Sequence, residues 1–266
     1  MKKVIKELIP PFLLKLIKKA SGHEYGFFGD FKTWKEAQKL STGYDAEIIL
    51  DKVRNSLLEV KAGRAIYERD SVLFDRIEYS WPLLAGLMLA ASQNNNKLNV
   101  IDFGGSLGST YFQNRKFLAG LSGLKWNIVE QNKIVEYGRR YFENESLKFF
   151  FNIDECFESN PDISVIILSS VIHYVEKPYE VLQRLIESGV RYFIVDRTPL
   201  IREKNERIVI QKINPDIVVG CYPVWLLNKD KFVGAFLKHY ELIEEFDSFE
   251  TINIDCEFKG FIFKLR

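Results

Sequence analysis

Residues 100–111 read VIDFGGSLGSTY and carry side chains that two different chemistries could use. Within them, residues 104–108 match the pattern G-x-S-x-G, in which Ser106 could be the nucleophile of a hydrolase. The same glycines, preceded by Asp102, could instead form a loop whose backbone amides approach a cofactor at the start of a helix. The residues before and after this stretch bear on the choice.

The hydrolase interpretation is supported by residue order and opposed by the expected elements. Asp196 and His239 follow Ser106 in the order that α/β-hydrolases use for their triad. In those enzymes, however, the nucleophile follows a central strand, after several earlier strands and an oxyanion loop. Here the chain before residue 96 reads as helix, so the pattern follows the first expected strand of the sheet. A serine hydrolase using Ser106 remains an alternative.

The cofactor interpretation accounts for more residues. Glu130 lies roughly 20 positions after the last glycine, at the end of the next expected strand, where an acid can bind both hydroxyls of a ribose. The dinucleotide fingerprint G-x-G-x-x-G is not met, because Phe103 stands at its first glycine. Asp102 would repel a pyrophosphate but would attract the ammonium group of a methionine moiety. The pattern therefore favours S-adenosylmethionine over a nicotinamide dinucleotide.

At these residues the sequence resembles the class I S-adenosylmethionine-dependent methyltransferases, from about residue 98 to residue 266. Asp154 corresponds to the acid that usually lies beside the adenine, and residues 169–174 to the loop where cofactor and acceptor meet. Ser106 stands where many members carry a third glycine. The resemblance implies that the cofactor is bound by Asp102, Gly104, Gly105, Gly108, Glu130, Asp154 and Ser170.

A narrower resemblance covers nearly the whole chain. The segments GFFGDFKTWKEA, STGYD, VIDFGGSLGSTY, SSVIHYVEKPYEVL and YPVW are similar to a small family of methyltransferases encoded in capsule and O-antigen gene clusters. This resemblance implies methyl transfer, most simply to oxygen, on a precursor of a surface polysaccharide. The acceptor would be a nucleotide sugar, a lipid-linked glycan, or a phosphate- or phosphoramidate-type decoration. A catalytically degenerate binding or scaffold protein at the membrane is a further alternative.

The residues expected at the acceptor each have a structural alternative. His173 could take the proton of an acceptor hydroxyl, or could only line the pocket. Arg197 could bind a phosphate or carboxylate through its guanidinium, or could pair with a nearby acid. Tyr44, in the segment STGYD, is expected to fold over the cofactor as part of a lid. We predict that the acceptor is bound by Tyr174, Arg197, Tyr222 and Trp225, with His173 as the catalytic residue.

The composition excludes several classes of protein. The 266 residues are 47% hydrophobic and 27% charged, which is typical of a folded globular protein. A net charge of +1 gives no overall field for nucleic acid, so we expect no nucleic-acid partner. The three cysteines and three histidines are scattered, which predicts no metal site and a cytoplasmic location. The apolar run at residues 81–91 is too short for a membrane span, which needs ~20 residues.

The expected elements divide the chain into three parts. Residues 1–30 form a basic amphipathic arm that could pack as a helix or contact the inner face of a membrane. Residues 31–95 form a helical extension or lid, and residues 96–266 a Rossmann-like catalytic domain with an insertion at 199–228 near the acceptor.

Strands and helices alternate in the catalytic domain and then stop alternating at its end. Helices are expected at 133–142 and 178–187, and two final strands follow with no helix between them. We therefore predict an α/β fold with helices on both faces and the seven-stranded sheet that the resemblance implies, its last strand antiparallel. The expected strands are 98–103, 126–130, 147–153, 165–168, 192–196, 240–246 and 260–265.

Overall fold

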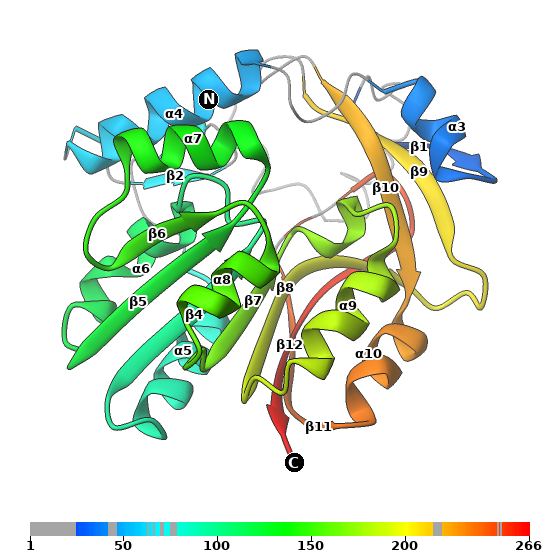
Figure 1. Ribbon diagram of the computed structural model, residues 1–266. Helices are drawn as coiled ribbons and strands as arrows, with labels where there is room; N and C mark the ends of the chain where they lie inside the picture. Colours follow the sequence, from blue (N-terminus) through cyan, green and yellow to red (C-terminus); the bar gives the residue numbers. More distant parts are fainter. Residues whose placement is uncertain are drawn as a thin grey trace, which may run out of the picture.

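A computed structural model describes residues 25–41, 47–62, 64–65, 67–69, 72–74, 79–214, 220–248, 250 and 252–266. Among these residues, ten strands form one mixed sheet and two further strands form a separate hairpin (Figure 1). No helix within these ranges is long and apolar enough to cross a lipid bilayer.

Seven strands make up the α/β part of the large sheet, in the order β6–β5–β4–β7–β8–β12–β11. Five of them are parallel: β4 (Lys97–Phe103), β5 (Gly123–Val129), β6 (Leu147–Phe150), β7 (Val165–Ser169) and β8 (Tyr192–Ile201). β12 (Glu257–Leu265) lies between β8 and β11 (Tyr240–Asp247) and is antiparallel to both. The predicted Rossmann-like sheet with an antiparallel last strand is confirmed.

Helices cover both faces of this sheet (Figure 1). One face packs against α4 (Glu47–Lys61), α5 (Trp81–Ser92), α6 (Ser109–Leu118) and α7 (Asn132–Tyr141). The other packs against α8 (Ile153–Ser159), α9 (Pro178–Glu187) and α10 (Lys229–Leu237). Ile166 and Ile167 on β7 are both fully buried but belong to different cores, because successive side chains of a strand point to opposite faces.

Three further strands, each antiparallel to the next, extend the sheet from the end of β8. The first, β10 (Cys221–Asn228), pairs in parallel with the last two residues of β8. β9 (Arg207–Lys212) then pairs with β10, and β1 (Gly26–Phe31) pairs with β9. The short helix α3 (Trp34–Lys39) lies against β9 and β10 and begins at Thr33, whose hydroxyl accepts a hydrogen bond from the Glu36 N–H (3.3 Å). The segment expected as an insertion therefore continues the sheet and forms its outer wall.

The prediction of helix throughout the first 95 residues is wrong at three strands. β1 is formed by part of the expected arm, and β2 (Tyr67–Arg69) pairs with β3 (Val72–Phe74) in the separate hairpin. β1 depends on pairing with β9, which is far away in the sequence, so the local residue pattern does not predict a strand there. The remainder of the arm, residues 1–24, lies outside the described residues.

Candidate functional site

A cavity of about 1300 Å³ opens at the carboxyl edge of β4, β5, β7 and β8 and reaches the wall made by β1, β9 and β10. Open α/β sheets bind their ligands at this edge. Small-molecule sites usually measure ~300–1000 Å³, so the cavity has room for two ligands side by side.

The loop after β4 forms one side of the cavity and requires its glycines. A Cβ at Gly104, where φ is +70°, would lie 2.2 Å from the Val171 side chain. At Gly105 it would lie 2.5 Å from the carboxyl carbon of Asp102. Gly104 and Gly105 line the cavity, whereas Gly108 does not and instead caps α6 at a φ of 101°. The loop is thus shaped by close contacts that any larger side chain would break.

Glu130 follows β5 and lies beside this loop. Its carboxylate accepts hydrogen bonds from the backbone N–H groups of Ser106 (3.2 Å) and Gln131 (2.8 Å). Burial raises the pKa of this carboxyl group, and the two hydrogen bonds oppose that change. A carboxylate offers about four acceptor positions. Glu130 can therefore accept two further hydrogen bonds, as a ribose diol requires.

Asp102 is 1% exposed and lines the same cavity. Its Oδ2 accepts a hydrogen bond from the indole Nε1–H of Trp126 (3.0 Å). Burial raises the pKa of Asp102 to about 7, helped by repulsion from Glu130 and opposed by the Trp126 hydrogen bond and by Arg197. Among the described residues no lysine, arginine or histidine forms an ion pair with Asp102, so a cationic ligand group would stabilise it.

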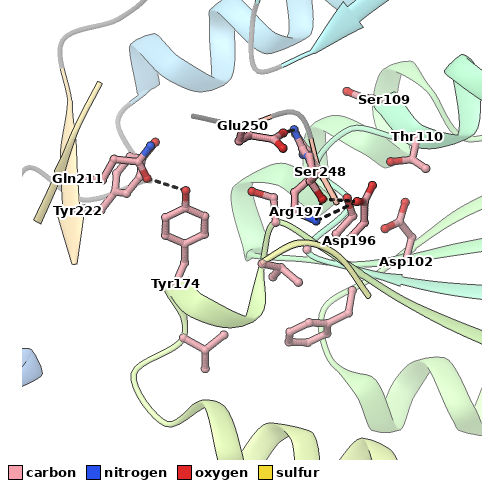
Figure 2. Close-up of a pocket in the computed structure, with 18 of the residues that line it drawn as sticks. Asp102, Ser109, Thr110, Tyr174, Asp196, Arg197, Gln211, Tyr222, Ser248 and Glu250 are labelled. Carbon is pink, nitrogen blue, oxygen red and sulfur yellow. Dashed lines mark hydrogen bonds and ion pairs between the residues drawn. The ribbon is translucent and has the colours of Figure 1, made fainter. Parts of the chain in front are cut away.

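The side of the cavity where we predict the acceptor is formed by the extension of the sheet. The Tyr174 hydroxyl donates to Oε1 of Gln211 on β9 (2.6 Å), and its ring meets that of Tyr222 edge-on at 5.3 Å (Figure 2). Tyr222 and Phe27 are the register partners of Gln211 on β10 and β1. Sequence reasoning missed Gln211 and Phe27, because only the pairing of distant strands brings them to the site.

Two predicted residues with left-handed backbones also line the cavity. Ser170 and Arg197, like Ser106 in the glycine loop, have φ near 52° and follow or interrupt strands at the carboxyl edge. Such conformations are sparsely populated for non-glycine residues and concentrate at functional sites. The Arg197 guanidinium forms an ion pair with Glu250 (Nη1–Oε1 3.7 Å), which also lines the cavity.

His173 does not line the cavity. It lies in the 3₁₀ turn η1 (Ile172–Tyr174), is 1% exposed, and its buried Nδ1 has no hydrogen-bond partner. Burial and then repulsion from Arg197 lower its pKa to about 3, which makes the imidazole a poor proton acceptor. The structure therefore argues against the predicted role of His173 as a catalytic base.

Like Gly108 and His173, the predicted residues Asp154 and Trp225 lie outside the cavity lining. Asp154 is exposed on α8 and pairs with Arg184, because the Asn152 side chain caps the helix and ends the strand earlier than predicted. Trp225 stacks on Trp34, with ring centroids 6.2 Å apart. It lies an odd number of residues from Tyr222 along β10, so the two side chains face opposite ways. Tyr44 lies outside the described residues.

The residues of the alternative hydrolase triad are not brought together. Ser106 and Asp196 line the cavity at the carboxyl edge of the sheet, but His239 immediately precedes β11. β11 and β8 are both antiparallel to β12 and start at the same edge, so His239 lies at the opposite edge of the sheet. The serine hydrolase alternative is wrong. The described residues also contain no cluster of His, Cys, Asp and Glu that could hold a metal ion.

No family model matches this sequence, and no curated protein matches it. Solved structures are similar to it at low identity. The N-terminal domain of EvdMO1, solved in the presence of SAH and D-fucose, is 12% identical, with 84% of this chain and 97% of that chain covered at a TM-score of 0.48.

Two methyltransferases show similar relationships. The 1,6-didemethyltoxoflavin-N1-methyltransferase of Burkholderia thailandensis is 10% identical, with 85% of this chain and 98% of that chain covered at a TM-score of 0.43. An S-adenosylmethionine-dependent methyltransferase of Clostridium acetobutylicum is 8% identical, with 71% and 92% covered at a TM-score of 0.45. Similarities this distant concern the course of the chain and not the substrate.

Proposed function

We propose that this protein is an S-adenosylmethionine-dependent methyltransferase. The hydrogen bond from the Ser106 N–H to the Glu130 carboxylate carries the proposal, because it joins the glycine loop to an acid able to bind a ribose. Asp102, buried beside that loop without a cation, suits the ammonium group of the methionine moiety. Phe151 and Ile153 line the cavity next to Glu130 and offer apolar contacts to a base.

The bound cofactor would supply an electrophilic methyl group on a positively charged sulfur. The chain's own contribution would be to align the acceptor atom with that methyl group and to exclude water from both. Alignment of this kind can supply ~7–11 kcal/mol of the barrier reduction. The cavity is large enough to hold cofactor and acceptor together, which such alignment requires.

We further propose that the acceptor is a small molecule methylated on a hydroxyl oxygen. The narrower family resemblance supports a glycan or nucleotide-linked precursor of capsule or O-antigen, phosphate- or phosphoramidate-type decorations included. The ring faces of Tyr174 and Tyr222 and the amide of Gln211 suit a sugar ring with hydroxyl groups. A phosphate would bind Arg197 in competition with Glu250. Peripheral contact of the basic arm with the membrane, in the cytoplasm, is part of the same proposal.

Calorimetry with S-adenosylmethionine and S-adenosylhomocysteine tests the cofactor assignment. Glu130→Ala should weaken both ligands, because leaving buried hydroxyls unpaired costs ~1–3 kcal/mol, or roughly 5- to 150-fold in affinity. Glu136→Ala, at an exposed glutamate on α7, is the matched control and should bind like the wild type. A wild-type protein that binds neither ligand would refute the function.

A screen with radiolabelled S-adenosylmethionine tests the acceptor. Neutral methyl glycosides, sugar nucleotides and sugar phosphates are offered separately to the full chain, and label in the product is measured. Transfer to a hydroxyl of any of these sugars supports the proposed acceptor class. Transfer to none of them, in a protein that binds the cofactor, contradicts it.

A further inference from the structure

Asp196 is a buried acid of the cavity that lies apart from the glycine loop and from Glu130. It is the register partner of Ser169 at the end of β7, and its backbone carbonyl accepts a hydrogen bond from the Ser170 N–H (2.9 Å). Its side chain is 3% exposed and lines the cavity. The Asp196 side chain thus lies at the cavity, where β7 ends beside β8.

Neutral groups make the hydrogen bonds to Asp196. Its Oδ1 accepts from the Arg197 backbone N–H (2.9 Å) and from the Ser248 hydroxyl (3.0 Å) (Figure 2). Within the part of the chain that the structure describes, no cationic side chain forms an ion pair with Asp196; the Arg197 guanidinium is paired with Glu250 instead. Burial raises the pKa of Asp196 and outweighs the attraction of Arg197.

A buried carboxylate of this kind points to a positively charged ligand group. Hydrogen bonds from neutral groups stabilise a buried carboxylate in part, and an opposite charge beside it stabilises the ionised form further. Asp102 is in register with Ile167, and Ile167 with Ile194, two residues before Asp196. The side chains of Asp102 and Asp196 therefore lie on the same face of the sheet, two strands apart. Two carboxyl groups so placed match a ligand that carries two cations.

We propose that Asp196 recognises the sulfonium charge of S-adenosylmethionine, while Asp102 recognises the ammonium group. The inference rests on the proposed function and goes beyond it. The ammonium group is common to S-adenosylmethionine and S-adenosylhomocysteine, but only the former has a charged sulfur. Asp196 therefore separates the cofactor from its product by charge.

The same carboxylate balances the charge of the reaction. Methyl transfer would break the C–S bond, with its electron pair left on sulfur, and would form a C–O bond at the acceptor. The Asp196 carboxylate would take the proton of the broken acceptor O–H bond and pass it to solvent. Positive charge leaves the sulfur as it arrives with the proton, so one anionic group serves both states.

Calorimetry of the full chain with S-adenosylmethionine and S-adenosylhomocysteine tests the inference without any acceptor. Asp196→Asn should lower the affinity for S-adenosylmethionine about 10- to 100-fold, as expected for loss of a charge-assisted contact. Its affinity for S-adenosylhomocysteine should stay within about twofold, a difference too small to reflect a lost hydrogen bond. Asp102→Asn should weaken both ligands together, because both carry the ammonium group.

Asp247→Asn is the matched control. It makes the same change of charge at the cavity rim, where Asp247 is exposed and paired with Lys259 (2.6 Å), and should leave the ratio of the two affinities unchanged. Ser248→Ala removes a hydrogen bond to Asp196 but no charge, and should also keep the ratio. If Asp196→Asn does not fold, Asp196→Ser makes the same test.

The outcomes separate the inference from the function beneath it. Selective loss of S-adenosylmethionine supports the inference. Equal loss of both ligands, or no loss of either, overturns it and leaves the methyltransferase proposal intact. Failure of the wild-type protein to bind either ligand overturns both.

Discussion

Neutralising Asp102 should stabilise the folded protein while impairing cofactor binding. Asp102 is 1% exposed, and within the described residues its carboxyl group accepts a hydrogen bond from the Trp126 indole alone. Asp102→Asn keeps the size of the side chain and an oxygen able to accept from Trp126. It removes the charge, which is costly to bury without a cation.

The size of the effect follows from the pKa. Folding raises the pKa of Asp102 from 3.8 to about 7. Between these values the folded protein holds a proton that the unfolded chain has released, so the free energy of unfolding falls as the pH rises. Above the folded pKa the ionised group costs ~4 kcal/mol, at about 1.36 kcal/mol for each pH unit. Below 3.8 the group is protonated in both states and contributes nothing.

Thermal and urea unfolding at pH 5 and pH 9 measure this difference. Asp102→Asn should gain stability over the wild type mainly at pH 9, with a melting temperature higher by roughly 10 °C, since 1 kcal/mol shifts it by ~2–4 °C in chains of this size. Asp162→Asn, at an exposed aspartate, controls for the change in net charge. Parallel stability curves for Asp102→Asn and the wild type across this range would refute the reasoning.

Three further variants probe the loop and the turn beside it. Ser106→Ala should keep cofactor affinity within a few-fold, and the wild type should not react with a fluorophosphonate. If Ser106 were a catalytic nucleophile, the same substitution would lower the reaction rate by several orders of magnitude. Gly105→Ala should cost ~1–3 kcal/mol of stability, because the added methyl group is forced against the Asp102 carboxyl group. Gly120→Ala should cost far less, because a Cβ there meets no atom within 4 Å. Equal melting temperatures of the two variants would contradict this. Folding lowers the pKa of His173 from 6.5 to about 3, so the wild type should lose ~2 kcal/mol of unfolding free energy between pH 6.5 and pH 5. His173→Gln should remove this loss. If urea unfolding shows the same loss in both proteins, the ring is not buried as described.

The placement of the residues proposed to hold the cofactor was predictable from local sequence. Asp102, its glycines and Glu130 sit at the ends of two consecutive parallel strands, so the strand pattern alone brings them to one edge. Ser170 follows the same rule at the end of β7. Each of these predictions needed only the order of strands and the residues at the end of each strand.

Side-chain direction was harder to predict. The 3₁₀ turn buries His173 and presents its neighbour Tyr174 to the cavity, a rotation that the sequence does not encode in any simple period. Asp154 turns outward because Asn152 begins a helix earlier than expected. Trp225 was predictable in principle, since strand alternation separates it from Tyr222, but the segment had first to be identified as a strand.

The β1–β9–β10 wall and the core strands supply different residues to the cavity. Groups proposed to hold the cofactor come from the carboxyl ends of β4, β5, β7 and β8, whereas Phe27, Gln211 and Tyr222 come from β1, β9 and β10. Substitutions on the inner face of β1, β9 and β10 would alter which acceptor fits without changing the residues proposed to bind the methyl donor. Relatives built on this plan could then differ in acceptor by changing these three strands, while the seven core strands keep the proposed cofactor residues.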